Sequence, residues 1–231
     1  MLLIADGKTK EHWDSAGTAK KFSAKVFLIQ SRRVSMQSGT RTIILHLVFV
    51  AAVASFCTGQ IETWKIDPAH SATQFSVRHM GISTVRGQFQ KITGTVQYDA
   101  KDLSKTSLEA TIDTASVDTR VEMRDNDLRG PNFFDVQKYP TIAFKSKKTE
   151  SAGEGKLKIT GDLTIRGVTK EVVLDVEGPT APVKDPKGNL HVGASAATKI
   201  NRKDFGVNGA SAMVGDDVSI ILDVELVKPA S

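Results

Sequence analysis

The sequence predicts an all-β protein, an antiparallel meander or up-and-down barrel of eight or nine strands with one short charged helix at a barrel end. Three observations predict this fold. From Ile61 onward, apolar and polar residues alternate with period two, which is typical of strands with one buried face. Short turn signals separate these segments. Helix signals stand out in one stretch, residues 116–134, "SVDTRVEMRDNDLRGPNFF".

The first 59 residues differ from the rest of the chain. Residues 1–35 show no apolar period and no helix cap. We interpret them as a spurious extension from a start codon assigned too early, or as a disordered segment. Residues 36–59 have the outline of a secretory signal peptide, with Arg41, an apolar run from Ile43 to Ala54 and then small residues. That run is shorter than the ~20 residues of a membrane-spanning helix. Export to a periplasmic or secreted location is therefore expected, with the folded domain at 60–231.

The charge balance of this domain is neutral. Eight of the 31 Lys and Arg residues and three of the 26 acids lie in 1–59, which leaves 23 of each sign. A neutral domain lacks the excess positive charge that is typical of nucleic-acid-binding proteins. Cys57 is the only cysteine, so the domain has no disulfide, thiolate metal site or cysteine nucleophile.

The strands can be assigned to faces from their alternation. In "TQFSVRH", Phe75, Val77 and His79 share one side. In "KLKITGDLTIRGVTKEVVLDVEG", Arg166-Gly167 is the expected two-residue turn of a hairpin. The residues predicted to face inward mix large and small side chains: Phe75, Val77, Val96, Leu108, Ala110, Ile112, Ile142, Phe144, Leu163, Ile165 and Ala194. A barrel of about eight strands is either filled by such side chains or holds one slim ligand.

The helix has start and stop signals of its own. Thr119 and Glu122 have the spacing of a capping box. Gly130-Pro131 predicts the stop, with a left-handed exit at the glycine. Its apolar face is thin, with Val121 and Leu128 seven residues apart. We therefore expect a surface helix that closes one end of the barrel.

Several side chains in and after this helix are candidates for a cavity mouth. Arg124 has a second arginine four residues before it and is expected to be available for a phosphate or other anionic head group. Asp125 and Arg129 have the spacing of a surface ion pair. For Phe133 and Phe134, we expect one ring to pack as a plug of the core and the other to line the entrance.

The three histidines of the domain are His70, His79 and His191. His79 shares the parity of inward residues, and the alternative is a structural imidazole in the core or at the rim. Zinc between His70 and His79 lacks a convincing third ligand, so no metal site is predicted.

Catalytic motifs are missing from the sequence, which has no nucleophile elbow, zinc-binding helix motif, phosphate loop or dinucleotide fingerprint. Asp216 and Asp217 are consecutive, so on a strand they point to opposite faces. We predict no catalytic residue and no cofactor.

Four segments together resemble the YceI family of bacterial polyisoprenoid-binding, lipocalin-like proteins: "WKIDPAHSATQFSVRHMGISTVRGQF", "SVDTRVEMRDNDLRGPNFFDVQKYPTIAF", "ITGDLTIRGVTKEVVLDV" and "INRKDFGVNG". They span nearly all of the domain in the order of the family. The resemblance implies an extended eight-stranded antiparallel lipocalin-like barrel that holds a long isoprenoid or another amphiphilic lipid. It also implies a protein without enzymatic activity.

The hypothesis is an exported protein that sequesters or carries such a lipid, as a monomer or homodimer that contacts membranes transiently. The predicted ligand-binding residues are Phe75, Val77, His79, Phe89, Leu108, Ile112, Arg124, Leu128, Phe133, Phe134 and Phe144. Two alternatives stay open. One is an enzyme acting on a small hydrophobic substrate, with His79 and a carboxylate as acid and base. The other is a filled barrel that mediates protein contacts.

Overall fold

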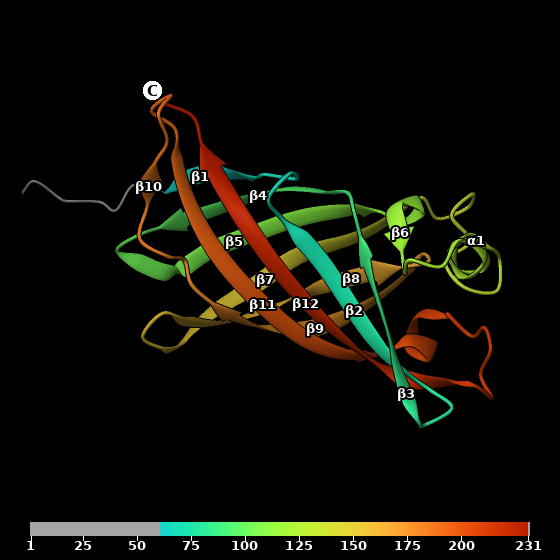
Figure 1. Cartoon of the computed structure of the whole chain (residues 1–231). Coiled ribbons are helices and arrows are strands. Elements are labelled where there is room, and N and C mark those ends of the chain that lie inside the picture. Colours follow the sequence, from blue (N-terminus) through green and yellow to red (C-terminus); the bar gives the residue numbers. More distant parts are fainter. Residues whose placement is uncertain (1–60, 231) are drawn as a thin grey trace, which may run out of the picture. The chain divides into compact units, whose positions relative to one another are not determined.

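The computed structural model describes residues 61–230. The predictions for 1–35 and for the signal peptide at 36–59 lie outside these residues. The elements (Figure 1) are β1 (Glu62–Ile66), β2 (Ala72–His79), β3 (Ser83–Phe89), β4 (Ile92–Asp99), β5 (Asp102–Asp113), η1 (Thr114–Ser116), β6 (Val117–Asp118), α1 (Glu122–Arg129), β7 (Thr141–Gly153), β8 (Lys156–Ile165), β9 (Val168–Glu177), β10 (Val183–Lys184), β11 (Leu190–Asn201), η2 (Arg202–Phe205) and β12 (Val214–Lys228).

Eight strands close into the predicted antiparallel barrel. They follow the order β11-β9-β8-β7-β5-β4-β1-β12, and β12 closes the ring by pairing with β11 from Leu190↔Lys228 to Asn201↔Asp217. The other edge of β12 changes partner along its length. It pairs with β2 up to Asp223 and with β1 at Leu226 and Val227. The β2–β3 hairpin therefore extends the wall beyond the end of β1.

The two ends of the barrel differ in what closes them. At one end, here called the loop end, lie α1, η1, η2, the 206–213 loop and the tips of the β2–β3 and β8–β9 hairpins (Figure 1, right). At the other, the strand end, lie the β4–β5 and β7–β8 turns, together with β10. The predicted hairpin at Arg166-Gly167 is confirmed, because Ile165 pairs with Val168 and both turn residues have positive φ.

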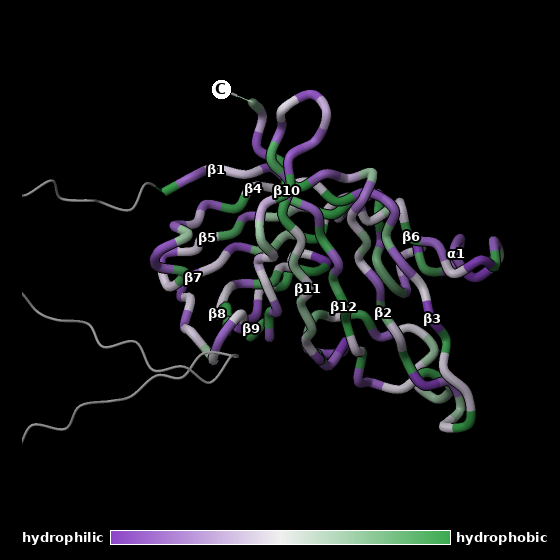
Figure 2. The backbone as a smooth tube through the Cα atoms, turned by 60° about the vertical axis from the view of Figure 1, so that its left-hand side comes forward, coloured by the Kyte–Doolittle hydropathy of each residue, from purple (hydrophilic) through white to green (hydrophobic). Residues whose placement is uncertain are grey.

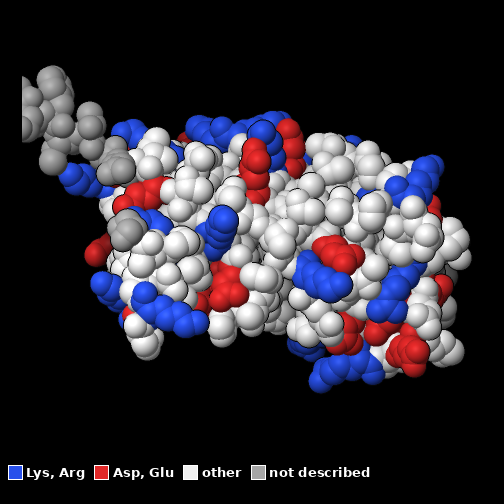
Figure 3. All heavy atoms as spheres, turned by 90° about the horizontal axis from the view of Figure 1, so that it is seen from above, with Lys and Arg blue, Asp and Glu red and all other residues white. Residues whose placement is uncertain are grey.

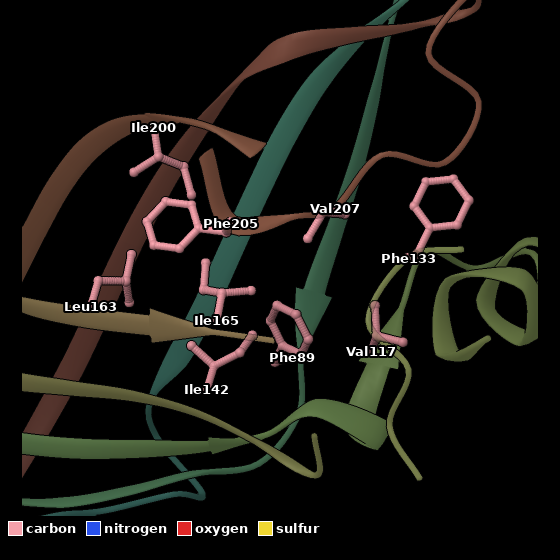
Figure 4. Packing of buried hydrophobic residues seen from close by; sticks show 9 residues of the cluster. All are labelled: Phe89, Val117, Phe133, Ile142, Leu163, Ile165, Ile200, Phe205 and Val207. Atoms are coloured by element: carbon pink, nitrogen blue, oxygen red, sulfur yellow. The ribbon is translucent and has the colours of Figure 1, made fainter. Parts of the chain in front are cut away.

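One seam of the barrel is only partly hydrogen-bonded. β9 and β11 pair through three residue pairs near the strand end, from Ser195↔Glu177 to Ala197↔Asp175. Toward the loop end no further pairs join these two strands. Phe205 of η2, which is 2% exposed, packs there against the core with Leu163 and Ile165 (Figure 4). Toward the loop end, side-chain packing thus takes the place of a backbone hydrogen-bond ladder between β9 and β11.

Alternation along the strands separates the core from the surface, and Figure 2 shows it as bands of opposite hydropathy along the backbone. Three clusters of buried residues form the core. The largest lies at the loop end and contains Phe89, Val117, Phe133 and Phe205. A second lies toward the strand end, where Trp64 stacks on Tyr98 with ring centroids 5.5 Å apart. A third, on β8 and β9, includes Leu157 and Leu174.

The helix is confirmed at a barrel end, but its predicted capping box is wrong. The N-cap is Val121, which makes no side-chain cap. Arg120 adopts a left-handed φ of 63°, so the chain turns before the helix begins. Thr119 lies in that turn and bonds instead to Asp125 through its amide and its hydroxyl, at 2.8 and 2.5 Å. The predicted left-handed exit is also wrong, because Gly130 has φ −74° and ψ 173°.

The outer face of the barrel carries cross-strand pairs of lysine with aspartate or glutamate. Lys145 bonds Glu109 at 2.7 Å, and Lys158 bonds Asp175 at 2.5 Å. In the face of Figure 3, charges of both signs are interspersed. This pattern agrees with the neutral charge balance of the domain. Within 61–230, no helix has the length and hydrophobicity needed to cross a membrane.

Candidate functional site

The barrel encloses an apolar cavity of about 240 Å³. Its wall is built by inward side chains of the strands and by residues that close the loop end. All eleven residues predicted from alternation to face inward belong to this wall: Phe75, Val77, Val96, Leu108, Ala110, Ile112, Ile142, Phe144, Leu163, Ile165 and Ala194. Small side chains in the wall leave the interior partly unfilled. On β11, for example, Ala194 and Ala196 both line the cavity.

Nine of the eleven predicted ligand-binding residues line this cavity: Phe75, Val77, Phe89, Leu108, Ile112, Leu128, Phe133, Phe134 and Phe144. The other two, His79 and Arg124, are absent from the lining. His79 is the last residue of β2, where it pairs with Ser83 and Val214 beyond the part of the strand that borders the cavity. Contact of His79 and Arg124 with a ligand stays a prediction.

Aromatic rings cover the loop end of the cavity. Phe75 and Phe89 lie 5.7 Å apart between centroids, and Phe134 meets Phe89 edge-on at 5.5 Å. Phe133 is 7% exposed and packs over Gly209, where a Cβ atom would lie 2.5 Å from its ring. Both rings of the predicted Phe133-Phe134 pair therefore line the cavity, and Phe133 is the more deeply buried of the two.

Three charged residues of α1, namely Arg124, Asp125 and Arg129, bind other groups of the protein. Arg124 donates to the hydroxyl of Thr119 at 2.7 Å and to its carbonyl at 3.0 Å. The predicted Asp125–Arg129 surface pair is wrong, because Asp125 is buried against Thr119. Arg129 instead donates to the carbonyls of Ala115 and Val117 at 2.9 and 2.8 Å. These bonds fasten α1 across the barrel end.

Arg202 is a wall residue that the sequence reasoning missed. It is 5% exposed and donates to the carbonyls of Val207, Gly209, Val214 and Gly215 at 2.7 to 2.9 Å. A planar guanidinium with five donors suits such a set of carbonyls. Its position directly after a strand that ends in Asn201 was a weak signal, since an arginine there is ordinarily a surface residue.

The cavity wall has few polar groups. Among its side chains, Tyr98 and Arg202 are the ionisable ones. Burial raises the pKa of Tyr98, so this phenol stays neutral over the physiological range. The hydroxyls of Thr73 and Thr106 are buried in the wall without a hydrogen-bond partner.

His70 and His79 are not neighbours, because His70 precedes β2 and His79 ends it. His70 instead bonds Asp67 at 2.8 Å, and that bond raises the pKa of the imidazole. On the same outer wall, hydrogen bonds to Glu225 at 2.6 Å and then to Asp185 at 3.3 Å raise the pKa of His191. Glu225 of β12 lies beside Asp67 and His70, and potential ligand atoms of these three residues lie within 4.8 Å of one another.

Comparison with known proteins agrees with this architecture. Residues 64–226 match the family model described as a YceI-like domain. A UPF0312 protein of Serratia proteamaculans is 36% identical over 80% of this chain and 96% of its own length. Protein YceI of Escherichia coli is 34% identical over 79% of this chain and 95% of its own.

Solved structures share the barrel. The Campylobacter jejuni YCEI protein is 35% identical with a TM-score of 0.57, covering 65% of this chain and 89% of its own. Burkholderia cenocepacia BcnA is 26% identical with a TM-score of 0.61, covering 69% and 98%. A polyisoprenoid binding domain from Saccharophagus degradans, 14% identical with a TM-score of 0.53, covers 74% and 100% and supports the fold alone.

Proposed function

This chain belongs to the YceI family, and we propose that it is an exported lipid-binding protein that sequesters or carries a polyisoprenoid or a similar amphiphilic lipid in the barrel. One observation carries the proposal: a cavity enclosed by the barrel whose wall is almost entirely apolar. Such a wall binds through removal of hydrocarbon from water, which requires no specific polar partner.

The size of the cavity favours a slender ligand. Its volume of about 240 Å³ is below the ~300–1,000 Å³ typical of small-molecule sites. A single five-carbon isoprene unit contributes roughly 3 to 4 kcal/mol on burial, at ~0.8 kcal/mol per methylene-sized group. Two buried units therefore approach micromolar affinity before ordering costs are subtracted. A linear or isoprenoid chain uses such a bore better than a compact molecule.

The composition of the wall favours binding over catalysis. Acid–base chemistry needs a titratable pair near the substrate, and no histidine or carboxylate lines the described cavity. His79, the candidate for such a role, is outside the lining. The aromatic rings and α1 at the loop end form the expected entrance for the lipid.

The proposal is tested by narrowing the cavity. Ala196 lines it, whereas the next residue, Ala197, is exposed on the outside of β11. Ala196→Phe is expected to weaken binding of a farnesyl or geranylgeranyl alcohol by at least tenfold, because the ring occupies the space of the chain. Ala197→Phe, the matched control, is expected to bind as the unchanged protein does. Displacement of an environment-sensitive fluorescent lipid measures both.

Mass spectrometry of lipid extracted from purified protein identifies what fills the cavity in the cell. Prenyl lipid at up to one equivalent is the expected result. Protein that carries no lipid, and that also fails to bind added prenyl alcohols, would exclude the carrier function. Fractionation of the producing cells, with detection of the protein in the periplasm or medium, tests its export.

A further inference from the structure

The cluster on the outer wall is independent of the lipid cavity. Glu225 lies between Val224 and Leu226, which both line the cavity, and strand alternation directs its own side chain outward. Asp67 and His70 come from the β1–β2 loop, at the place where β12 changes partner from β2 to β1. One potential ligand atom from each of the three residues lies within 4.8 Å of the others.

The β1–β2 loop is hydrogen-bonded to β12 at Glu225. The amide of Asp67 donates to the carbonyl of Glu225 at 2.8 Å, and the amide of Glu225 donates to the hydroxyl of Ser71 at 3.0 Å. Asp67 is oriented further by the amide of Ala69 at 2.9 Å. The β1–β2 loop and β12, which carry the cluster, are therefore held together before any ligand binds. This lowers the entropic cost of ordering the site on binding.

The side chain of Glu225 is also oriented by a hydrogen bond with His191. Its Oε1 lies 2.6 Å from Nδ1 of His191, whose Nε2 faces Asp185 at 3.3 Å. A carboxylate has two oxygens, so Oε1 can stay bonded to His191 while Oε2 serves a cation. Hydrogen bonds from outer groups to metal-binding carboxylates are a recurrent feature of metal centres.

The charge of this cluster is balanced differently from the rest of the outer wall. Elsewhere, many strand carboxylates pair with lysines, as Glu109 does with Lys145. The ion pairs found for Asp67, Glu225 and Asp185 in the described part of the chain are with histidines. Three carboxylates lie beside two imidazoles, so the carboxylates outnumber the groups that can carry positive charge, and a divalent cation can compensate the remaining negative charge.

We propose that Asp67, His70 and Glu225 form a binding site for a divalent transition-metal ion of the zinc class. Imidazole nitrogen and carboxylate oxygen are both zinc ligands at about 2.0 to 2.2 Å. In a tetrahedral centre of that size, neighbouring donors lie roughly 3.4 Å apart. The potential donor atoms lie up to 4.8 Å apart, so some of them must approach one another by about an ångström. Rotation of the His70 side chain can supply this shift, because that side chain is 65% exposed. The fourth position is open to water.

The experiment is calorimetric titration of Zn²⁺ into the full chain, purified without a polyhistidine tag and stripped of metal with EDTA. One saturable equivalent is expected. His70→Ala and Glu225→Gln each remove a ligand and are expected to weaken binding by at least tenfold. His191→Gln leaves the ligands in place but removes the orienting bond, and a smaller loss of affinity is expected.

The matched control is Glu109→Gln, which neutralises another outward glutamate of the barrel wall. It is expected to bind Zn²⁺ as the unchanged protein does. NMR signals of the histidine rings give a second measurement that needs no variant: one equivalent of Zn²⁺ is expected to shift His70 and His191 and to leave His79 unchanged. Lack of saturable binding, equal affinity in His70→Ala and Glu225→Gln, or an unshifted His70 ring would each overturn the site.

Discussion

The two ends of the barrel are closed by different interactions. At the strand end, backbone ladders run to the turns and the Trp64–Tyr98 stack fills the interior. At the loop end, arginines donate to backbone carbonyls of the connecting segments and of the strand ends beside them. Arg129 holds Ala115 and Val117, and Arg202 holds four carbonyls of the 207–215 segment.

The same end has a third arginine of this kind. Arg166, in the β8–β9 turn, donates a short hydrogen bond to the carbonyl of Phe133, which ties the hairpin to the segment after α1. Lysine has three donors on a flexible stem, whereas guanidinium has five in a planar fork. The difference teaches that closure with irregular backbone depends on arginine side chains, and closure with strands depends on ladders.

The largest expected effect comes from removing Arg202. Arg202→Met leaves four carbonyls without their donor, and we expect a loss of at least about 3 kcal/mol in the free energy of unfolding. That corresponds to a melting temperature lower by roughly 6 to 12 °C for a domain of this size. Thermal unfolding followed by circular dichroism measures it. Lys199→Met, which breaks the exposed pair between Lys199 of β11 and Asp217 of β12, is the control. Equal losses in both variants would refute the comparison.

A smaller effect is expected for the helix. Arg129→Gln removes the bonds to Ala115 and Val117 but leaves the core in place, so we expect a loss of about 1 to 2 kcal/mol. Hydrogen exchange should quicken in α1 and η1 while the β11–β12 ladder keeps its protection. Lys158→Gln on β8 is the control for loss of a surface charge. Unchanged exchange in α1 would show that Arg129 does not fasten the helix.

The smallest effect is expected at the strand end, at the start of β5. The hydroxyl of Ser104 donates to Asp102 at 2.5 Å and lowers the pKa of this carboxyl, with Lys105 adding to the shift. A lowered folded-state pKa stabilises the fold above the unfolded value of about 3.9, and the stabilisation is lost as the pH falls through the folded value.

Melting temperatures of the unchanged protein and of Asp102→Asn test this linkage. The difference should be small and constant between about pH 5 and 8 and should shrink as the pH falls below the unfolded value of about 3.9. Ser104→Ala removes the donor and should reduce the same dependence. A difference that grows as the pH falls would contradict the sign.

Much of the barrel could be predicted because strand alternation is local. Each inward residue is specified by its neighbours two positions away, so the assignments from Phe75 to Ala194 needed no knowledge of pairing. The helix was located from its stop and its charges, but its contacts were not. Whether Asp125 pairs with Arg129 or with Thr119 depends on the turn at Arg120, which has no clear sequence signal.

The sequence by itself determined the β class, the inward faces and the neutral, cysteine-free composition of the domain, because these depend on local pattern and residue type. The tertiary structure decided how much space the inward residues leave, which carbonyls Arg202 serves and which residues meet across the wall. Asp67 and His70 lie more than 150 positions from Glu225 in the chain. Only the closure of β12 against β1 and β2 brings them together, since long-range pairing is a property of the closed barrel.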